Sequence, residues 1–489
     1  MIKRIYLTLV VGAGLAAAQP AVAQDQPVSS GQTFTLQQCI DYALENSITA
    51  RNAKLDEEIA QAKVKETVGV GLPQVNGTVS LTHNERLPRF FSTRQTAFGF
   101  SGLADSLYNQ FYPELENDDV LASQNFFQLK SSGDAGVNVT QIIFNGSYLV
   151  GLQASQAYKE LSYRSSAQTK EQIIQQVTKA YYAVLINKER SDLFTSNIAR
   201  VDTLLRNTQA LFKNGFAESI DADRIQVTLN NLVAERDKFL NLNELGIALL
   251  KFQMNYPLNQ PIQVEGKIED VQSEVSTALY QETIDYNLRP DFQVLEANRK
   301  LQELNLKNQR AAYLPSLSAF ANLGYSTQSA TIGGLFKTNS DISDNGSIGP
   351  DKWYPYTMFG LTLNVPIFSG FQTRYKVQQE KIALQKIQNT FVSVKSGIDL
   401  EVQQSTINYK NAMKSLNAQK QNMELASKVA RITKIKYEQG VGSNLEVIDA
   451  EDSLRQAQTN YYNALYDVMV AKIDLDKAYG KLAPQSVSK

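Results

Sequence analysis

"IDYALENSITARNAKLDEEIAQAKVKETVGVGLPQV" occupies residues 40–75 and has a counterpart at residues 284–317, "IDYNLRPDFQVLEANRKLQELNLKNQRAAYLPSL". Both stretches open with Ile-Asp-Tyr, continue with a helical pattern and close on Leu-Pro, at Pro73 and Pro315. Proline removes a backbone donor and disfavours helix in the residue before it, so both helices are expected to end there. The internal repeat predicts a fold built from two similar halves.

After each Leu-Pro the pattern changes from a helical period to strict alternation. Strands are predicted at about residues 74–83, 136–144, 316–325 and 358–368. In the last of these, Phe359, Leu361 and Leu363 alternate with small or polar residues. Such alternation is typical of a membrane β-strand with one face to lipid and one to water. A half-buried strand of a soluble sheet gives the same pattern, but four such strands in a repeat favour the membrane interpretation.

Each half then continues into a very long helix. Residues 146–212 and 371–439 contain almost no glycine or proline. At a rise of about 1.5 Å per residue, either helix would be about 100 Å long. That length exceeds an ordinary globular helix and indicates a coiled-coil, tunnel or repeat element. The many Gln, Asn and Ser residues outside the apolar positions favour the wall of a water-filled tunnel.

The first 23 residues have the pattern of a signal peptide. Lys3 and Arg4 precede an apolar stretch that ends in Ala21-Val22-Ala23. An uncleaved anchor helix is the alternative. No other segment has about 18 consecutive apolar residues, so entry into a membrane would require a barrel. The only cysteine, Cys39, allows no internal disulfide, and the net charge of −1 without a basic block argues against nucleic acid as a partner.

The expected domain organisation follows from the repeat. A signal peptide (1–23) precedes a first structural repeat (24–255), a linker (256–275), a second repeat (276–480) and a C-terminal tail (481–489), with helical turns near 214–220 and 439–445. Two halves supply four strands, which cannot close a barrel because their edges would face lipid unpaired. Three copies supply twelve, so a homotrimer that shares one barrel is the economical arrangement. Four strands per chain alone also fit other ring sizes.

These features in this order resemble the TolC family of outer-membrane efflux channels over nearly the whole mature chain. The likeness rests on the repeat, the Leu-Pro strand entries, the strand exits "TQIIFNG" and "VPIFSG", and "GVGSNLEVIDA" at residues 440–450. It implies a mixed α/β membrane protein: a trimeric 12-stranded outer-membrane β-barrel, four strands per chain, continued by a long α-helical periplasmic tunnel. It also implies the outer membrane of a Gram-negative bacterium as the location.

The resemblance further implies a function and partners. The protein would be the outer-membrane channel of a tripartite efflux or type I secretion system. Its partners would be two further copies of itself, a periplasmic adaptor protein, an inner-membrane transporter of RND or ABC type and outer-membrane lipid. Substrates would pass from the pump to the exterior without chemical change.

The stretch "YEQGVGSNLEVIDAE", residues 437–451, is predicted to be a helical hairpin turn. Gly440 and Gly442 are expected to supply the positive φ of a tight turn. Ser443 is expected to cap the next helix, with Glu446 three residues later as in a capping box. A similar turn is expected at Gly215. Helix capping and the helix dipole alone account for the carboxylates of Glu446 and Asp449 without any further function.

The resemblance gives a second interpretation of the same residues. Glu446 and Asp449 match the family's acidic entrance rings, and a ring of carboxylates favours cations. Tyr437 and Asp221 match a tyrosine and an aspartate that hold the entrance closed, so a contact between them is expected. The family's arginine at this turn is replaced by Gly442. The hairpin turns, either docking surfaces for the adaptor or plain exposed turns, include Gly215, Gly440, Gly442 and Ser443.

An enzyme and an exported scaffold are the two other classes of protein to consider. The single histidine, His83, and the lack of a metal-binding, phosphate-binding or nucleophile motif argue against an enzyme, so no catalytic residue, cofactor or metal site is expected. An exported coiled-coil scaffold or adhesin without a pore is the alternative function. It accounts for the long helices but not for four alternating strands placed symmetrically between them.

Overall fold

The computed structural model describes residues 32–93, 110, 114, 116, 118–123, 127–266, 283–337 and 353–482. The predicted signal peptide, residues 267–275 of the predicted linker and residues 483–489 of the predicted tail lie outside the described residues. The chain divides into two compact units. Within the described residues, unit 1 comprises 32–47, 176–266 and 415–469, and unit 2 comprises the remainder. The division into two sequence repeats with the bounds given above stays a prediction.

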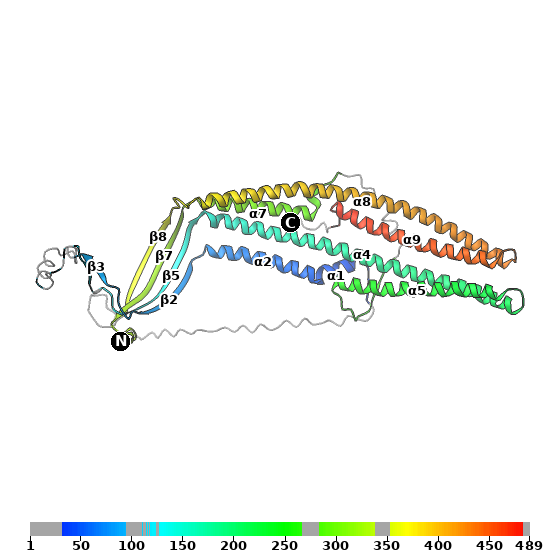
Figure 1. Ribbon diagram of the computed structural model, residues 1–489, viewed down its shortest axis with the longest axis horizontal. Helices are drawn as coiled ribbons and strands as arrows, with labels where there is room; N and C mark the ends of the chain where they lie inside the picture. Colours follow the sequence, from blue (N-terminus) through cyan, green and yellow to red (C-terminus); the bar gives the residue numbers. More distant parts are fainter. Residues whose placement is uncertain are drawn as a thin grey trace, which may run out of the picture. The chain divides into compact units, whose positions relative to one another are not determined.

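Unit 2 contains an antiparallel sheet of four strands in the order β2-β5-β7-β8 (Figure 1). The strands are β2 (Gln74–His83), β5 (Ser131–Asn145), β7 (Ser316–Ser329) and β8 (Tyr354–Asn364). β2 coincides with the expected strand, whereas β5 and β7 are longer than expected. The expectation that the last strand continues to residue 368 is wrong. Asn364 pairs with Ser316, the first residue of β7, and Pro366 has no N–H to extend the ladder.

The sheet has one apolar and one polar face. Register places Val137 opposite Leu323, and Ala321 opposite Phe359, on the apolar face. That face is solvent-exposed in the single chain: Phe359 is 81% exposed and Val79 76%. The two edge strands, β2 and β8, each pair on one side only within the described residues. The exposed apolar face requires cover from water, and the open edges require further strands to pair with them.

The helices that enter the sheet end as the Leu-Pro motifs predict. α2 (Ile48–Val70) ends before Pro73, and α7 (Pro290–Ala311) ends before Pro315. The two Ile-Asp-Tyr motifs, in contrast, differ in structure. The first lies inside a helix, whereas the second precedes one, with Tyr286–Leu288 in a 3₁₀ turn, η2. Pro290 occupies the first turn of α7 and holds the preceding residue extended, so the expected helix from residue 284 is wrong at its start.

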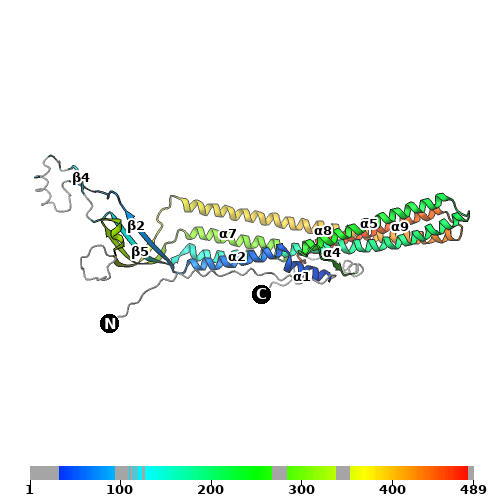
Figure 2. The same ribbon diagram turned by 90° about the horizontal axis from the view of Figure 1, so that it is seen from below.

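The first predicted helix is also divided in two. α1 (Leu36–Asn46) is capped by the Thr35 hydroxyl and ends at Ser47, whose backbone is extended. Four further strands of the described residues form two pairs, β1 (Gln32–Phe34) parallel to β6 (Ile262–Val264), and β3 (Phe90–Thr93) antiparallel to β4 (Val120–Ser123). The other described elements are η3 (Ile332–Phe336), α4 (Gly146–Lys213), α5 (Ser219–Met254), α8 (Gln372–Glu438) and α9 (Asn444–Ala478). Figure 2 gives a second view of these elements.

The two longest helices, α4 with 68 residues and α8 with 67, cover the ranges expected from the sequence. Among the described helices there is no apolar segment long enough to cross a membrane.

A tyrosine lies across two glycines on the polar face of the sheet. A Cβ on Gly136 would stand 3.0 Å from the Tyr356 hydroxyl, and a Cβ on Gly324 would stand 2.9 Å from Tyr356 Cζ. The hydroxyl donates to Asp134 Oδ1 at 3.3 Å. The glycines therefore leave room for the ring to lie flat against β7 and β5, where any larger residue would lift it away.

We expect Gly324→Ala to destabilise the sheet. Its new Cβ would also lie 2.8 Å from the Ala135 carbonyl oxygen, a backbone atom that cannot rotate away. Overpacking of this kind costs about 1–3 kcal/mol, so the temperature at which the detergent-solubilised oligomer dissociates on electrophoresis should fall by several degrees. Gly77→Ala is the control, because nothing in the chain lies within 4 Å of its added Cβ. Equal behaviour of the two variants would contradict the packing role of Gly324.

Candidate functional site

The predicted site residues lie at the turns of two helical hairpins: α4–α5, whose turn is green in Figure 1, and α8–α9, whose turn is orange. Both turns belong to unit 1. Gly215 and Gly440 have positive φ values of 79° and 74°, as the turns require. Gly442 does not, so that expectation is wrong. Its Cβ would lie 3.1 Å from both Lys436 Cβ and the Tyr437 nitrogen. Gly442 is needed for close approach of the chain to the end of α8, not for an unusual φ.

Ser443 caps α9 as predicted. Its hydroxyl accepts a hydrogen bond from the Glu446 backbone N–H at 3.2 Å. The Glu446 carboxylate lies 3.9 Å from Lys436 Nζ, and both side chains are about half exposed. Such an exposed pair contributes little to stability. The N-cap is therefore the local stabilising contact of this turn, and the carboxylate of Glu446 remains accessible to solvent.

The two predicted ring carboxylates share the exposed side of α9. Glu446 and Asp449 are exposed, whereas Val447 and Ala450 are buried, at 1% and 6%. The spacing of three residues puts both carboxylates on one face of the helix, opposite its packed face. This arrangement suits a carboxylate ring in an oligomer and equally suits helix capping. The ring stays a prediction.

The structure does not pair Tyr437 with Asp221. The hydrogen bond of the Tyr437 hydroxyl is to the Thr208 hydroxyl, at 3.0 Å, and Thr208 is fully buried. Asp221 accepts from Asn444 Nδ2 at 2.9 Å through its backbone carbonyl. Its carboxylate accepts from the Glu218 N–H at 3.4 Å, at the start of α5. A role of Tyr437 and Asp221 in closing an entrance stays a prediction.

Both contacts nevertheless connect the first hairpin to the second. Thr208 and Tyr437 join α4 to α8, and Asp221 and Asn444 join α5 to α9. An apolar core shared by α4, α5 and α9 lies beside them, with Tyr437 of α8 packed against it: Phe194, Val201, Leu204, Leu205, Ile225, Leu232, Phe239 and Val447. The turns of the two hairpins are thus held together by burial of this core and by two neutral hydrogen bonds.

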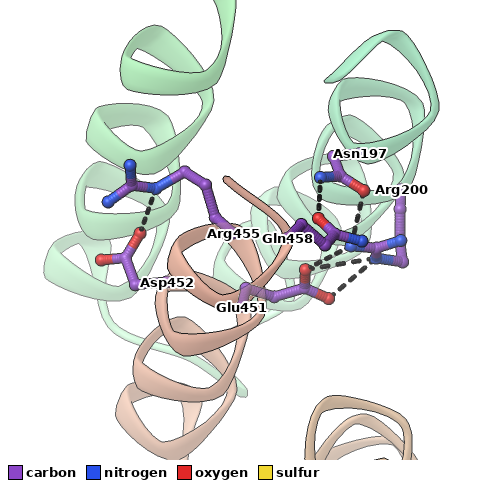
Figure 3. A network of polar contacts seen from close by, with 6 residues as sticks. All are labelled: Asn197, Arg200, Glu451, Asp452, Arg455 and Gln458. Atoms are coloured by element: carbon purple, nitrogen blue, oxygen red, sulfur yellow. Dashed lines mark hydrogen bonds and ion pairs between the residues drawn. The ribbon is translucent and has the colours of Figure 1, made fainter. Parts of the chain in front are cut away.

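A charged pair adds to this connection farther along α4 and α9 (Figure 3). Arg200 Nη2 lies 2.7 Å from Glu451 Oε2, and its Nε donates to Glu451 Oε1 at 2.9 Å. Arg200 also donates to Asn197 Oδ1 at 3.1 Å, and Asn197 donates to Gln458 Oε1 at 2.7 Å. The Glu451 side chain is only 7% exposed, so this two-point pair is protected from solvent. Nothing in the sequence indicated these partners, because their pairing depends on how α4 and α9 face each other.

We expect Glu451→Gln to weaken the connection between the hairpins. Arg200 would lose its charged partner at a largely buried position, at a cost of about 1–3 kcal/mol. Hydrogen–deuterium exchange should show faster exchange of the amides around Arg200 and Glu451. Asp452→Asn is a matched control, since Asp452 is 47% exposed and pairs with Arg455 of its own helix at 3.5 Å. If the control variant accelerated exchange as much as Glu451→Gln, the pair would not be the connecting element.

Unit 2 contains a separate cluster of charged residues around the buried Arg289. Arg289 Nη1 lies 2.7 Å from Glu401 Oε2 and donates to the Ala478 carbonyl at 3.2 Å, while Nη2 lies 2.8 Å from Asp291 Oδ2. Glu171 of α4 is 4% exposed, and its Oε1 has no hydrogen-bond partner within the described part of the chain. Burial raises the pKa of Glu171 to about 7, although Arg289 and Lys477 act in the opposite direction.

This pKa predicts a pH-dependent stability. The folded state favours the protonated carboxyl of Glu171, so its contribution is fully present below the ordinary value of 4.5 and is lost as pH rises through about 7. Glu171→Gln mimics the protonated form. The melting temperature of the variant minus that of wild type should increase as pH rises from 5.5 and should level off above about 7. A difference that stays flat between pH 5.5 and pH 8.5 would show that Glu171 does not titrate in this range.

The chain is similar in sequence and in fold to known outer membrane proteins. Residues 285–481 match the outer membrane efflux protein family. The outer membrane protein TolC of Vibrio cholerae is 23% identical over 360 residues, which are 72% of this chain and 78% of that protein. The CmeC outer membrane channel of Campylobacter jejuni superposes with a TM-score of 0.65 at 17% identity, covering 93% of this chain and 87% of that one. The MtrE outer membrane channel of Neisseria gonorrhoeae, in its open state, has a TM-score of 0.65 at 18% identity, covering 93% and 91%.

The sheet, the long helices and these matches define an outer-membrane channel of the efflux class. The chain resembles the TolC family of outer-membrane efflux channel proteins in sequence and in fold. Its four-stranded sheet and long helices have the fold of these outer-membrane channels over more than 90% of the chain. The protein lies in the outer membrane of a Gram-negative bacterium, with a large periplasmic part. The predicted family, fold class and location are confirmed, and the scaffold or adhesin alternative has no support in these matches.

Proposed function

We propose that this protein is the exit channel of a tripartite efflux or type I secretion system. It passes substrates from an inner-membrane transporter and a periplasmic adaptor to the exterior. The observation that carries the proposal is the sheet of unit 2, with one exposed apolar face, one polar face and two open edges. Three such sheets joined edge to edge leave no unpaired backbone group toward lipid and enclose a polar passage.

The hairpin turns would form the periplasmic entrance and would help to keep it closed. Glu446 and Asp449, three copies of each, would form acidic rings at the periplasmic entrance, where carboxylates favour cations. Tyr437 and Asp221 would help to close that entrance through their contacts with Thr208 and Asn444. Each of these contacts joins the two hairpins of one chain, so opening that separates the hairpins must break both.

The turns themselves would receive the adaptor. Phe216 is 81% exposed and Val441 73%, and each stands beside a turn glycine, Gly215 and Gly440. Large apolar side chains that protrude from a turn are typical of surfaces that bind a protein partner. We propose that the adaptor contacts these two side chains and the adjoining Gly442 and Ser443. The inner-membrane transporter, of RND or ABC type, would act through this adaptor.

No chemical reaction is part of the proposal. The relatives reported above are an outer membrane protein and outer membrane channels.

Single-channel conductance in a planar bilayer tests the channel and its entrance together. Wild type should form a cation-selective pore, and Glu446→Gln/Asp449→Asn should reduce the selectivity, because six carboxylates of the trimer become neutral amides. Asp223→Asn, an exposed carboxylate of α5, is the control and should leave the selectivity unchanged.

Two other results would contradict parts of the proposal. A pore with unchanged selectivity in the double variant would keep the channel but leave Glu446 and Asp449 as helix-capping residues only. A protein that gives no conductance and is extracted from membranes by urea or carbonate would contradict the channel itself.

A further inference from the structure

The four strands of the sheet contain a single charged residue. Asp134 of β5 is the only Asp, Glu, Lys or Arg among β2, β5, β7 and β8. A charge in the membrane-spanning part of a protein is costly and is retained where it faces water or serves a function. The position of Asp134 in the sheet therefore determines what it does.

Register assigns Asp134 to the polar face. It is paired with Ser80 on one side and with Ser326 on the other, and Ser326 is paired with Tyr354. The next residues on the same face of β5 are Gly136 and Asn138, both small or polar. The apolar residues of β5 lie between them and alternate with this face: Ala135, Val137 and Val139. In the barrel the apolar face contacts lipid, so Asp134 faces the water-filled lumen.

Tyr356 holds this carboxylate on the wall of the barrel. Its hydroxyl donates to Asp134 Oδ1 at 3.3 Å, and its ring lies over Gly136 and Gly324. The ring crosses the sheet from β8 to β5 along the wall. The hydrogen bond satisfies one lone pair of Oδ1 and fixes the position of the side chain.

We propose that Asp134 is a charge-selectivity residue of the barrel lumen, separate from the acidic residues of the periplasmic entrance. The inference rests on the proposed channel function and deepens it. Threefold symmetry places three Asp134 carboxylates at one level of the pore, with no Lys or Arg in any of the four strands to neutralise them. Three fixed negative charges around a water-filled passage raise the local concentration of cations and of cationic substrates, and lower that of anions.

Cysteine labelling of the purified trimer tests the placement without need for an open channel. The native thiol of Cys39 is fully buried, so it gives little background. A hydrophilic, positively charged methanethiosulfonate should modify Asp134→Cys and the same-face Asn138→Cys. It should not modify Val79→Cys, which lies on the apolar face and is covered by detergent or lipid. Failure to label Asp134→Cys would overturn the placement.

Reversal potentials in a potassium chloride gradient test the role. Asp134→Asn should lower the cation-to-anion permeability ratio by roughly two- to five-fold, in wild type and in the Glu446→Gln/Asp449→Asn background alike. Asp134→Asn/Asn138→Asp, which returns the charge to the same face four residues away, should restore most of the ratio. Tyr356→Phe, which keeps the charge and the ring, should keep the ratio near wild type.

Failure of the Asp134 selectivity role and failure of the channel function would give different results. A conducting pore whose ratio is unchanged in Asp134→Asn would overturn the selectivity role and leave the channel function intact. A trimer that labels at Asp134→Cys but never conducts, in wild type or any variant, would contradict the proposed channel function.

Discussion

The open edges of the β2-β5-β7-β8 sheet are the constraint on which the rest of the structure depends. Each edge strand carries backbone N–H and C=O groups that lipid cannot satisfy, and each unsatisfied group would cost several kcal/mol. β2 and β8 must therefore pair with copies of each other, so the fold of one chain is complete only in the oligomer. The exposed apolar residues of the single chain, such as Phe359 and Val79, follow from the same constraint, because lipid replaces the missing core.

A barrel wall has lipid on its apolar face and the passage on its polar face, so large side chains on the polar face must lie along the wall. The ring of Tyr356 does so because Gly136 and Gly324 leave space for it to lie flat. Asp134 is tolerated in a sheet that is otherwise free of charge because it lies on this face and has a hydrogen-bond donor. The two glycines thus allow the Tyr356 ring to lie along the sheet, where its hydroxyl reaches Asp134.

Elements whose signal is local could be predicted from the sequence. Alternation and Leu-Pro located the strands, and the lack of glycine and proline located α4 and α8. Errors arose where one residue changes the local backbone: Pro290 delays a helix, and Gly442 is required for space and not for φ. The partner of Tyr437 could not be predicted. Whether it meets Asp221 or Thr208 depends on the rotation of α8 against α4, which tertiary packing sets and a single sequence does not encode.

The connections between the two hairpins differ in kind along the helices. Near the turns they are neutral, through Thr208 with Tyr437 and Asn444 with Asp221, whereas about two turns farther along α4 the Arg200–Glu451 pair is ionic and largely buried. Neutral hydrogen bonds contribute about 1 kcal/mol each and can be exchanged for bonds to water at an exposed turn. Loss of one partner of a buried ion pair is much more costly, since the other charge is left without compensation. Separation of the hairpins is therefore easiest at the turns and is resisted at Arg200, so a partner that acts on the turns moves the part of the hairpins that is least strongly held.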